Sequence, residues 1–134
     1  ILLFCLLFLA ERGFAQDEEG LKNQSLDDIE ALSSKDFPYI ERFHQAVREK
    51  LAGNFEEAQS LFEDCLKEKS NDDAVHFGLA EIAKEQKRLS SAKTHYVKAL
   101  ELDSNNITYI QELAYITYEQ GDFEESKIYY DKFT

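Results

Sequence analysis

The sequence predicts an all-α protein in which pairs of helices stack into a solenoid. Three observations predict this fold. A sequence pattern recurs with a period of 34 residues, which is typical of repeats built from two helices. Within each copy, apolar residues follow the three- and four-residue steps of an amphipathic helix. Glycine and proline are scarce, with five and one in 134 residues, whereas the good helix formers Glu, Lys, Ala and Leu are abundant.

The repeat is most evident in three short stretches that begin at Gly53, Lys87 and Gly121. They read GNFEEAQSLFEDCL, KRLSSAKTHYVKAL and GDFEESKIYYDKF, and they align without a gap at an offset of 34. Small and bulky side chains recur in the same columns, as expected for the packing faces of repeated helices. The columns are Ala46, Ala80 and Ala114; Phe55, Leu89 and Phe123; Ala58, Ala92 and Ser126; Phe62, Tyr96 and Tyr130; and Cys65, Ala99 and Phe133.

The first element, residues 1–15, has the pattern of a secretory signal peptide. The apolar run ILLFCLLFLA precedes a plausible cleavage site after Ala15. The run is shorter than the ~20 residues that a membrane span requires, and Glu11 and Arg12 end it. An uncleaved membrane anchor is the alternative. Because the chain begins with Ile1 and shows no positively charged leader, we expect its true start to lie upstream.

Residues 16–38 are expected to form a polar linker. Within it, Ser25 to Leu32 has the composition of a short capped helix. Pro38 suits the first turn of the next helix, where a backbone N–H has no partner to lose. That helix is predicted to run to about Ala52.

Five more helices follow from the apolar periodicity and from the turn residues between them. They are predicted over residues 54–69, 73–87, 89–102, 107–120 and from 122 onward. Gly53 and Gly121 fall where a helix must end in a left-handed residue, and Lys87 takes that place in the middle copy at some cost in strain. Asn54 and Asp122 suit the N-caps of the helices that follow. The last helix is expected to stop a few residues short, as in a fragment.

These columns resemble the tetratricopeptide repeat. The resemblance is carried by the stretches GNFEEA, ALELDSNN and GDFEES, and it covers residues 39–134. It implies a right-handed superhelix of about three units, at 39–72, 73–106 and an incomplete 107–134. No proline separates the units, which is a departure from the family pattern. In the column where the family has a large aromatic residue, early in the first helix of each unit, this chain has Arg42, His76 and Ile110.

Charge and cysteine content narrow the classes of function. The net charge of −12 disfavours binding to nucleic acid and to anionic lipid headgroups, because both require a basic protein surface. Past residue 15 the only cysteine in the sequence is Cys65, so no disulfide is expected within the exported chain. An exported domain without disulfides suits a bacterial periplasm better than an extracellular space.

No catalytic or metal-binding motif stands out. His44, His76 and His95 have no i, i+4 spacing and no neighbouring cysteine, so each is expected to be a partly exposed helix residue. Cys65 falls in an apolar column and is expected to be a small buried side chain. Adjacent glutamates recur in phase at two helix starts, where carboxylates favour the helix dipole. We therefore expect no enzyme activity, no cofactor, no metal and no small-molecule substrate.

The family resemblance also implies a binding surface. In that family the first helices of the units line a concave groove that holds a peptide or a partner's helix. Carried over by alignment, the groove would be aromatic and apolar with a few charges. The principal residues implied are Phe43, Val47, Lys50, Phe77, Glu81, Lys84, Gln111, Tyr115 and Tyr118, and further members are Ile40, Leu51, Glu85, Thr108 and Glu119. Packing of the protein's own terminal segments in the groove is the alternative.

The sequence therefore predicts a non-enzymatic scaffold for protein–protein interaction, exported to the periplasm or the outer membrane of a bacterium. Its partner would be a protein or peptide and not nucleic acid. Association with a membrane would require that the N-terminal apolar segment stay uncleaved. The alternative function is that of a sensory or docking region of a larger signalling or cell-wall enzyme, with a catalytic domain beyond residue 134.

Overall fold

The computed structural model describes residues 35–134. Within this range, residues 35–52 are helical, five further helices follow, and there is no strand. The further helices are α2 (Phe55–Glu68), α3 (Asp73–Glu85), α4 (Leu89–Leu102), α5 (Ile107–Glu119) and α6 (Phe123–Phe133). None of the helices in the described part is long and apolar enough to cross a membrane. The predicted all-α fold is confirmed; the predicted signal peptide and the short helix at 25–32 lie outside the described residues.

The helix bounds follow the prediction closely, with two differences. Residues 35–38 were expected to end a linker, but they are already helical. Helix α3 ends at Glu85 and not at Lys87. The second difference has a local cause, because Lys87 has a positive φ of 59° and a right-handed helix cannot include such a residue.

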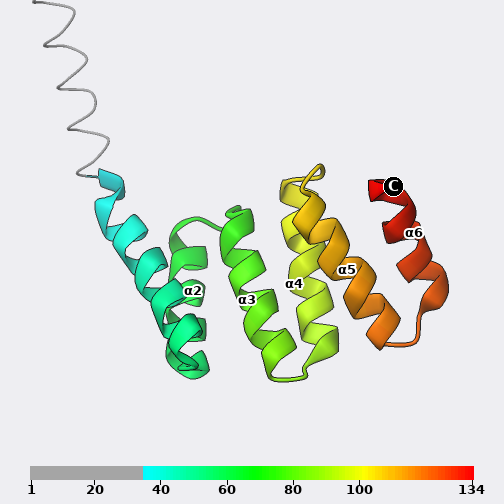
Figure 1. Cartoon of the computed structure of the whole chain (residues 1–134). Coiled ribbons are helices and arrows are strands. Elements are labelled where there is room, and N and C mark those ends of the chain that lie inside the picture. The colour runs from blue at the N-terminus through cyan, green and yellow to red at the C-terminus, as the bar shows by residue number, and fades with distance from the viewer. Residues whose placement is uncertain (1–34) are drawn as a thin grey trace, which may run out of the picture. The chain divides into compact units, whose positions relative to one another are not determined.

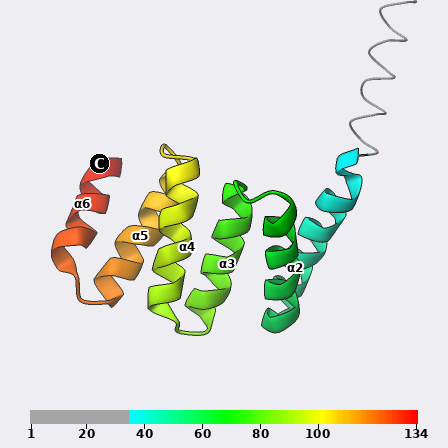
Figure 2. The same cartoon turned by 180° about the vertical axis from the view of Figure 1, so that it is seen from behind.

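Residues 39–134 form one compact unit in which each helix packs against the next along the chain. The helices alternate between two sides of this unit. Residues 39–52 lie in front of α2 and α5 lies in front of α4 in Figure 1, and both orders reverse in Figure 2. We call the side formed by residues 39–52, α3 and α5 the first-helix face.

The three turns within helix pairs have the same geometry. Gly53 and Gly121 have φ values of 83° and 82°, and Lys87 adopts the same left-handed region. In each turn the left-handed residue donates its N–H to the carbonyl three residues earlier, at 2.9 to 3.1 Å. The next residue donates to the carbonyl five residues earlier, at 2.8 to 2.9 Å. This is the Schellman arrangement, which uses the last free carbonyls of a helix, and it confirms the prediction for these three positions.

The predicted N-caps are only partly confirmed. Asp122 accepts a hydrogen bond from the backbone N–H of Glu125 at 3.0 Å, as a capping carboxylate should. Asn54 stands at the N-cap position of α2 but makes no side-chain cap bond. Its amide donates to the Glu49 carboxylate at 2.7 Å instead, so it ties the turn to the end of the preceding helix.

The core is built from the small-residue columns of the repeat. Ala46, Ala80 and Ala114 are fully buried, as the close approach of the helices in each pair requires. In the second small column Ser126 takes the place of alanine, and its hydroxyl donates to the carbonyl of Ala114 at 2.8 Å, so the buried polar group is satisfied. The predicted buried position of Cys65 is confirmed, and burial raises the pKa of its thiol.

The aromatic column shows where packing ends. Phe62 and Tyr96 are fully buried, whereas Tyr130 is 44% exposed. In the last pair the neighbouring ring, Tyr129, is partly buried against the core cluster of α3, α4 and α5. Tyr130 thus differs in burial from the other two rings of its column, because no helix of the described chain covers that side of α6.

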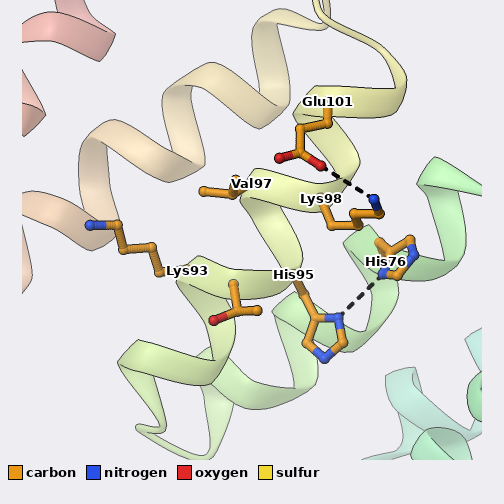
Figure 3. Close-up of a pocket in the computed structure, with 7 residues that line it drawn as sticks. His76, Lys93, His95, Val97, Lys98 and Glu101 are labelled. Carbon is orange, nitrogen blue, oxygen red and sulfur yellow. Dashed lines mark hydrogen bonds and ion pairs between the residues drawn. The ribbon is translucent and has the colours of Figure 1, made fainter.

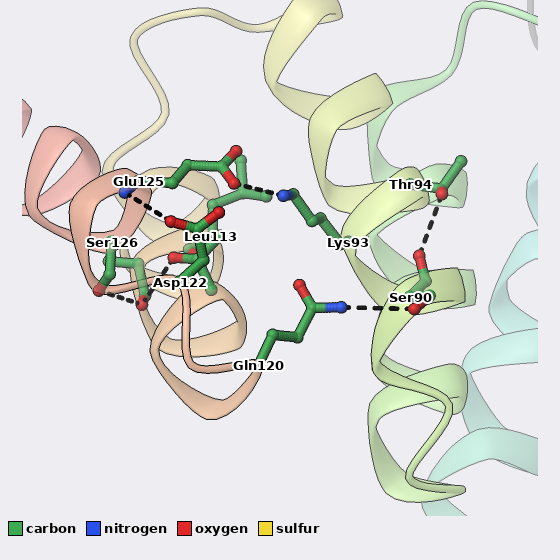
Figure 4. A network of polar contacts seen from close by, with 10 residues as sticks. Ser90, Lys93, Thr94, Leu113, Gln120, Asp122, Glu125 and Ser126 are labelled. Carbon is green, nitrogen blue, oxygen red and sulfur yellow. Dashed lines mark hydrogen bonds and ion pairs between the residues drawn. The ribbon is translucent and has the colours of Figure 1, made fainter.

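Polar contacts hold α4 to the last helix pair. Lys93 of α4 forms an ion pair with Glu125 of α6, and the amide of Gln120 donates to the Ser90 hydroxyl at 3.4 Å (Figure 4). The N-terminal end of α4 is thus connected both to α6 and to the loop that precedes it.

Candidate functional site

The predicted groove residues divide into two groups, and the first group is more buried than expected. Phe43, Val47 and Phe77 are half-buried and pack against the two core clusters. The Phe43 ring meets the ring of Phe62 edge-on, with centroids 5.8 Å apart. The Phe77 ring lies 5.2 Å from that of Tyr109. These side chains support the helices of the first-helix face more than they offer surface to a ligand.

Two ion pairs cross the first-helix face from one helix to the next. Lys50 pairs with Glu81 of α3, and Lys84 pairs with Glu112 of α5 at 2.7 Å. The four side chains are only 17 to 27% exposed, so they lie low on the surface. Lys50 and Lys84 are 34 residues apart and therefore equivalent, but their partners are not. The residue equivalent to Glu81 is Tyr115. Lys84 pairs instead with Glu112, about one helical turn before Tyr115.

Each ion pair borders a shallow depression on this face. The first has a volume of about 320 Å³ and is lined by Lys50, Leu51, Gly53, Phe55, Glu81 and Glu85. The second has a volume of about 370 Å³ and is lined by Lys84, Glu85, Lys87, Gln111, Glu112 and Tyr115. Four of the lining positions correspond at an offset of 34, so the repeat itself generates the two depressions.

The second group of predicted residues is exposed and lies on α5. Tyr115 is 44% and Tyr118 is 55% exposed, and Gln111 is exposed one turn earlier. Tyr118 occupies the column of Lys50 and Lys84, where the other two units form their ion pairs. Its ring meets that of Phe123 edge-on, with centroids 5.3 Å apart. The last unit therefore replaces a charged pair by exposed aromatic surface.

Beneath this face lies one buried hydroxyl without a hydrogen bond. Tyr96 is fully buried, and among the described residues its hydroxyl is the only buried side-chain polar atom without a partner. Burial raises the pKa of this hydroxyl, and the nearby carboxylate of Glu112 raises it further. The equivalent contact one unit earlier is apolar: the Phe62 ring lies directly over Gly78, where a β-carbon would come within 2.5 Å of it.

A second candidate site lies between α3 and α4, where two histidines meet (Figure 3). The Nδ1 atoms of His76 and His95 are 3.3 Å apart, and the Nε2 atom of His76 is 3.3 Å from the carbonyl oxygen of Ser70. His76 is only 8% exposed, so the prediction of a partly exposed residue is wrong for it. A cavity of about 530 Å³ opens beside the pair and is also lined by Lys93, Thr94, Val97, Lys98 and Glu101.

The electrostatics of the pair are set by burial and by its neighbours. Burial lowers the pKa of His95, and His76 adds to this effect, while Glu63 opposes it and Arg88 supports it. Lys98, beside the cavity, lies 3.3 Å from the Glu101 carboxylate. Among the residues that the structure describes, no group of three or more His, Cys, Asp or Glu side chains comes together as a metal centre.

Sequence reasoning missed this pair because the two histidines are 19 residues apart on different helices. The repeat alignment contains a signal that could have found it. His76 and His95 occupy columns that hold Ile110 and Tyr129 in the last unit. Ile110 is buried there and Tyr129 is partly buried, so both columns lie at packed positions.

Comparison with known proteins identifies the repeat. Residues 51–114 match the family model described as tetratricopeptide repeat. No curated protein sequence matches the chain. The structure of MamA, residues 41 to the end, from Desulfovibrio magneticus RS-1 is 16% identical with a TM-score of 0.66; the match covers 70% of this chain and 53% of MamA. This chain thus spans about half the length of that protein.

A second similar structure is a chaperone. SycD, the type III secretion translocator chaperone of Yersinia enterocolitica, is 15% identical with a TM-score of 0.65, and the match covers 70% of both chains. SycD in complex with a peptide of the translocator YopD is 15% identical and has the same TM-score, with 69% of this chain and 70% of SycD covered. At such identities the likeness shows the fold alone, and it confirms the predicted helical-repeat solenoid.

Proposed function

Because residues 51–114 match the tetratricopeptide repeat model and the helices form a repeat solenoid, we propose that the chain is a non-enzymatic scaffold that holds a peptide or a partner's helix on its first-helix face. The observation that carries the proposal is the exposed aromatic surface of α5. Tyr115 and Tyr118 are half exposed on the one unit that lacks the lysine of the other two. Tyrosine is favoured at binding surfaces, because it offers a large rigid ring together with a hydrogen-bonding hydroxyl.

The chemistry of this face favours an apolar partner segment with few charges. Lys50 and Lys84 are already neutralised by glutamates of the neighbouring helix. Gln111 can accept and donate hydrogen bonds beside the tyrosines. The depression between α3 and α5 is wide enough for one side chain of a partner, and the equivalent depression one unit earlier would take another. An extended peptide or an amphipathic helix could fill both.

Support for a peptide partner comes from a relative of the same fold. One of the similar structures is that of SycD with a peptide of the translocator YopD. The identity of 15% carries no ligand over to this chain, so the comparison supports the class of partner and not its identity.

Tyr115 and Tyr130 allow a sharp test, because each is 44% exposed but only Tyr115 lies on the first-helix face. Peptides would be selected from a random library against the full chain, and their affinities measured by fluorescence anisotropy. Tyr115→Ala should weaken the selected peptides by about tenfold or more, as expected for a binding hot spot. Tyr118→Ala should act in the same direction, and Tyr130→Ala should leave the affinity unchanged.

The opposite pattern would rule the face out. Peptides that bind Tyr115→Ala as tightly as wild type, or that lose affinity only with Tyr130→Ala, would place binding elsewhere on the chain. Circular dichroism of each variant shows whether a lost affinity reflects lost helix.

We also propose that the protein is exported to the bacterial envelope. The support is the apolar run at residues 1–10 followed by small residues up to Ala15. Expression of the chain with its native upstream sequence in a bacterium, followed by mass spectrometry of the protein N-terminus, tests this. A mature protein that begins at Gln16 in the periplasmic fraction is expected; an intact N-terminus in the cytoplasm would refute export.

A further inference from the structure

We propose that His76 and His95 form a binding site for a divalent transition-metal ion of the zinc, nickel or copper type, with the two Nδ1 atoms as ligands. The pair lies between α3 and α4 at the edge of the 530 Å³ cavity (Figure 3). It is separate from the first-helix face and is not needed for the scaffold function. No motif in the sequence pointed to it.

The distance between the two nitrogens fits such an ion. A zinc ion binds histidine nitrogen at about 2.0–2.1 Å in a tetrahedral arrangement, so two such ligands are about 3.3–3.4 Å apart. The two Nδ1 atoms are 3.3 Å apart. An ion at this distance from both nitrogens would lie to one side of the line that joins them, so both rings would have to turn to point their lone pairs at it.

The hydrogen bond of His76 prepares its Nδ1 atom for this role. Its Nε2 atom is 3.3 Å from the carbonyl oxygen of Ser70, which can only accept, so Nε2 carries the proton and donates it. The Nδ1 atom then has a free lone pair. Metal-binding histidines commonly donate their other N–H to a backbone carbonyl in this way.

His95 has two states available to it. In the metal-free pair its Nδ1–H donates to the lone pair of His76. When its proton moves to Nε2 instead, both Nδ1 atoms carry a free lone pair and can bind one cation together. His95 is only partly buried, so Nε2 can exchange this proton with water.

The placement of two imidazoles here also calls for an explanation. The same columns hold Arg42 and Leu61 in the first unit and Ile110 and Tyr129 in the last, so the repeat does not require an imidazole at either position. Burying polar rings at such positions lowers stability unless their hydrogen bonds are complete. In the metal-free pair the hydrogen bond between the two Nδ1 atoms meets this need, and a bound ion would take its place.

The residues around the pair indicate which ion is expected and what would complete its coordination. Imidazole ligands suit zinc, nickel and copper, whereas calcium and magnesium prefer oxygen. The cationic side chains that line the cavity, Lys93 and Lys98, each face a carboxylate, Glu125 and Glu101. Because the described residues bring no third His, Cys, Asp or Glu to the pair, water or a group from a partner would complete the coordination.

The test is calorimetric titration of the full chain with zinc chloride at neutral pH. We expect one zinc ion per chain with an affinity that His95→Gln lowers by about tenfold or more. His44→Gln is the matched control, because His44 lies on the helix of residues 39–52 and makes no contact with the pair; it should bind zinc as the wild type does. An excess of magnesium should not compete.

Three results would overturn the proposal. They are unchanged zinc binding by His95→Gln, equal loss in His44→Gln, and displacement of zinc by magnesium, which would indicate surface carboxylates. A second measurement does not depend on the folding of any variant. In NMR spectra of the wild type, substoichiometric zinc should shift the ring signals of His76 and His95 while those of His44 stay in place, and a shift of His44 alone would contradict the site.

Discussion

Tyr96 of α4 and Tyr130 of α6 occupy the same column of the repeat, yet the first is fully buried and the second is 44% exposed. The difference arises because α5 packs on α4, whereas no helix of the described chain packs on the corresponding side of α6. A column of the repeat therefore specifies a packing position only where the next helix is present. The middle pair is held from both sides and the last pair from one.

The first-helix face shows a second difference between the same two units. Lys84 of α3 is paired with Glu112, while the equivalent residue of α5, Tyr118, is 55% exposed. Within the described chain, the first two units carry charged pairs across neighbouring helices, and the third carries exposed aromatic residues in their place. The exposed surface available to a partner is thus formed by residues that differ from their equivalents in the other units.

The largest difference in stability is expected between alanine substitutions of Phe62 and Tyr130, the first and last residues of the aromatic column. Phe62→Ala removes a fully buried ring and should destabilise the protein by about 3–5 kcal/mol. Tyr130→Ala removes a half-exposed ring from the same column and should cost less than about 1 kcal/mol. Urea denaturation followed by circular dichroism measures both. Similar losses for the two variants would show that the last pair is packed as tightly as the first.

A smaller effect is expected where Phe62 meets α3. Gly78→Ala would place a β-carbon 2.5 Å from the Phe62 ring, so the ring or the helix must shift within a closely packed core. Alanine favours helix over glycine, but the overlap should dominate and destabilise by about 1–3 kcal/mol. Gly78→Ala should destabilise the Phe62→Leu variant by less than it destabilises the wild type, because the overlapping ring is then absent. A stabilising Gly78→Ala would mean that the ring can move aside.

Two tyrosine hydroxyls differ in their hydrogen bonds: that of Tyr109 has a partner and that of Tyr96 has none. Tyr109 donates to the Asp73 carboxylate at 2.7 Å, and Tyr109→Phe should cost about 1.5 kcal/mol, the lower end for a hydrogen bond to a charged group. Tyr96→Phe removes the buried hydroxyl that has no partner and should be neutral or slightly stabilising. The same urea titrations decide the point. A loss with Tyr96→Phe as large as that with Tyr109→Phe would imply a bound water at Tyr96.

Most of the fold could be predicted from the sequence because it repeats. A tight helix pair requires small residues where its helices meet and a left-handed residue in its turn. These requirements recur in each unit, at Ala46, Ala80 and Ala114 and at the turn residues Gly53 and Gly121. The repeat does not by itself predict how deeply each member of a column is buried. The exposure of Tyr130 depends on a neighbour that the column does not encode.

The candidate sites were less predictable for a different reason. Alignment grouped Tyr115 and Tyr118, which are exposed on α5, with Phe77, which is half-buried in packing. The contact between His76 and His95 depends on two helices meeting side by side. Spacing along one chain segment carries no information about such a pair, although comparison of columns between units does.

The smallest effect concerns the one turn that lacks glycine. Lys87 holds a φ of 59° that Gly53 and Gly121 adopt without strain in the other two turns. Lys87→Gly removes that strain but adds freedom to the unfolded chain, so a net gain of about 0.5–1 kcal/mol is expected. Lys87→Ala is the control, since it removes the ammonium group and keeps the β-carbon that causes the strain. If alanine stabilises as much as glycine, the gain comes from the lost charge, and the middle turn is no more strained than its two neighbours.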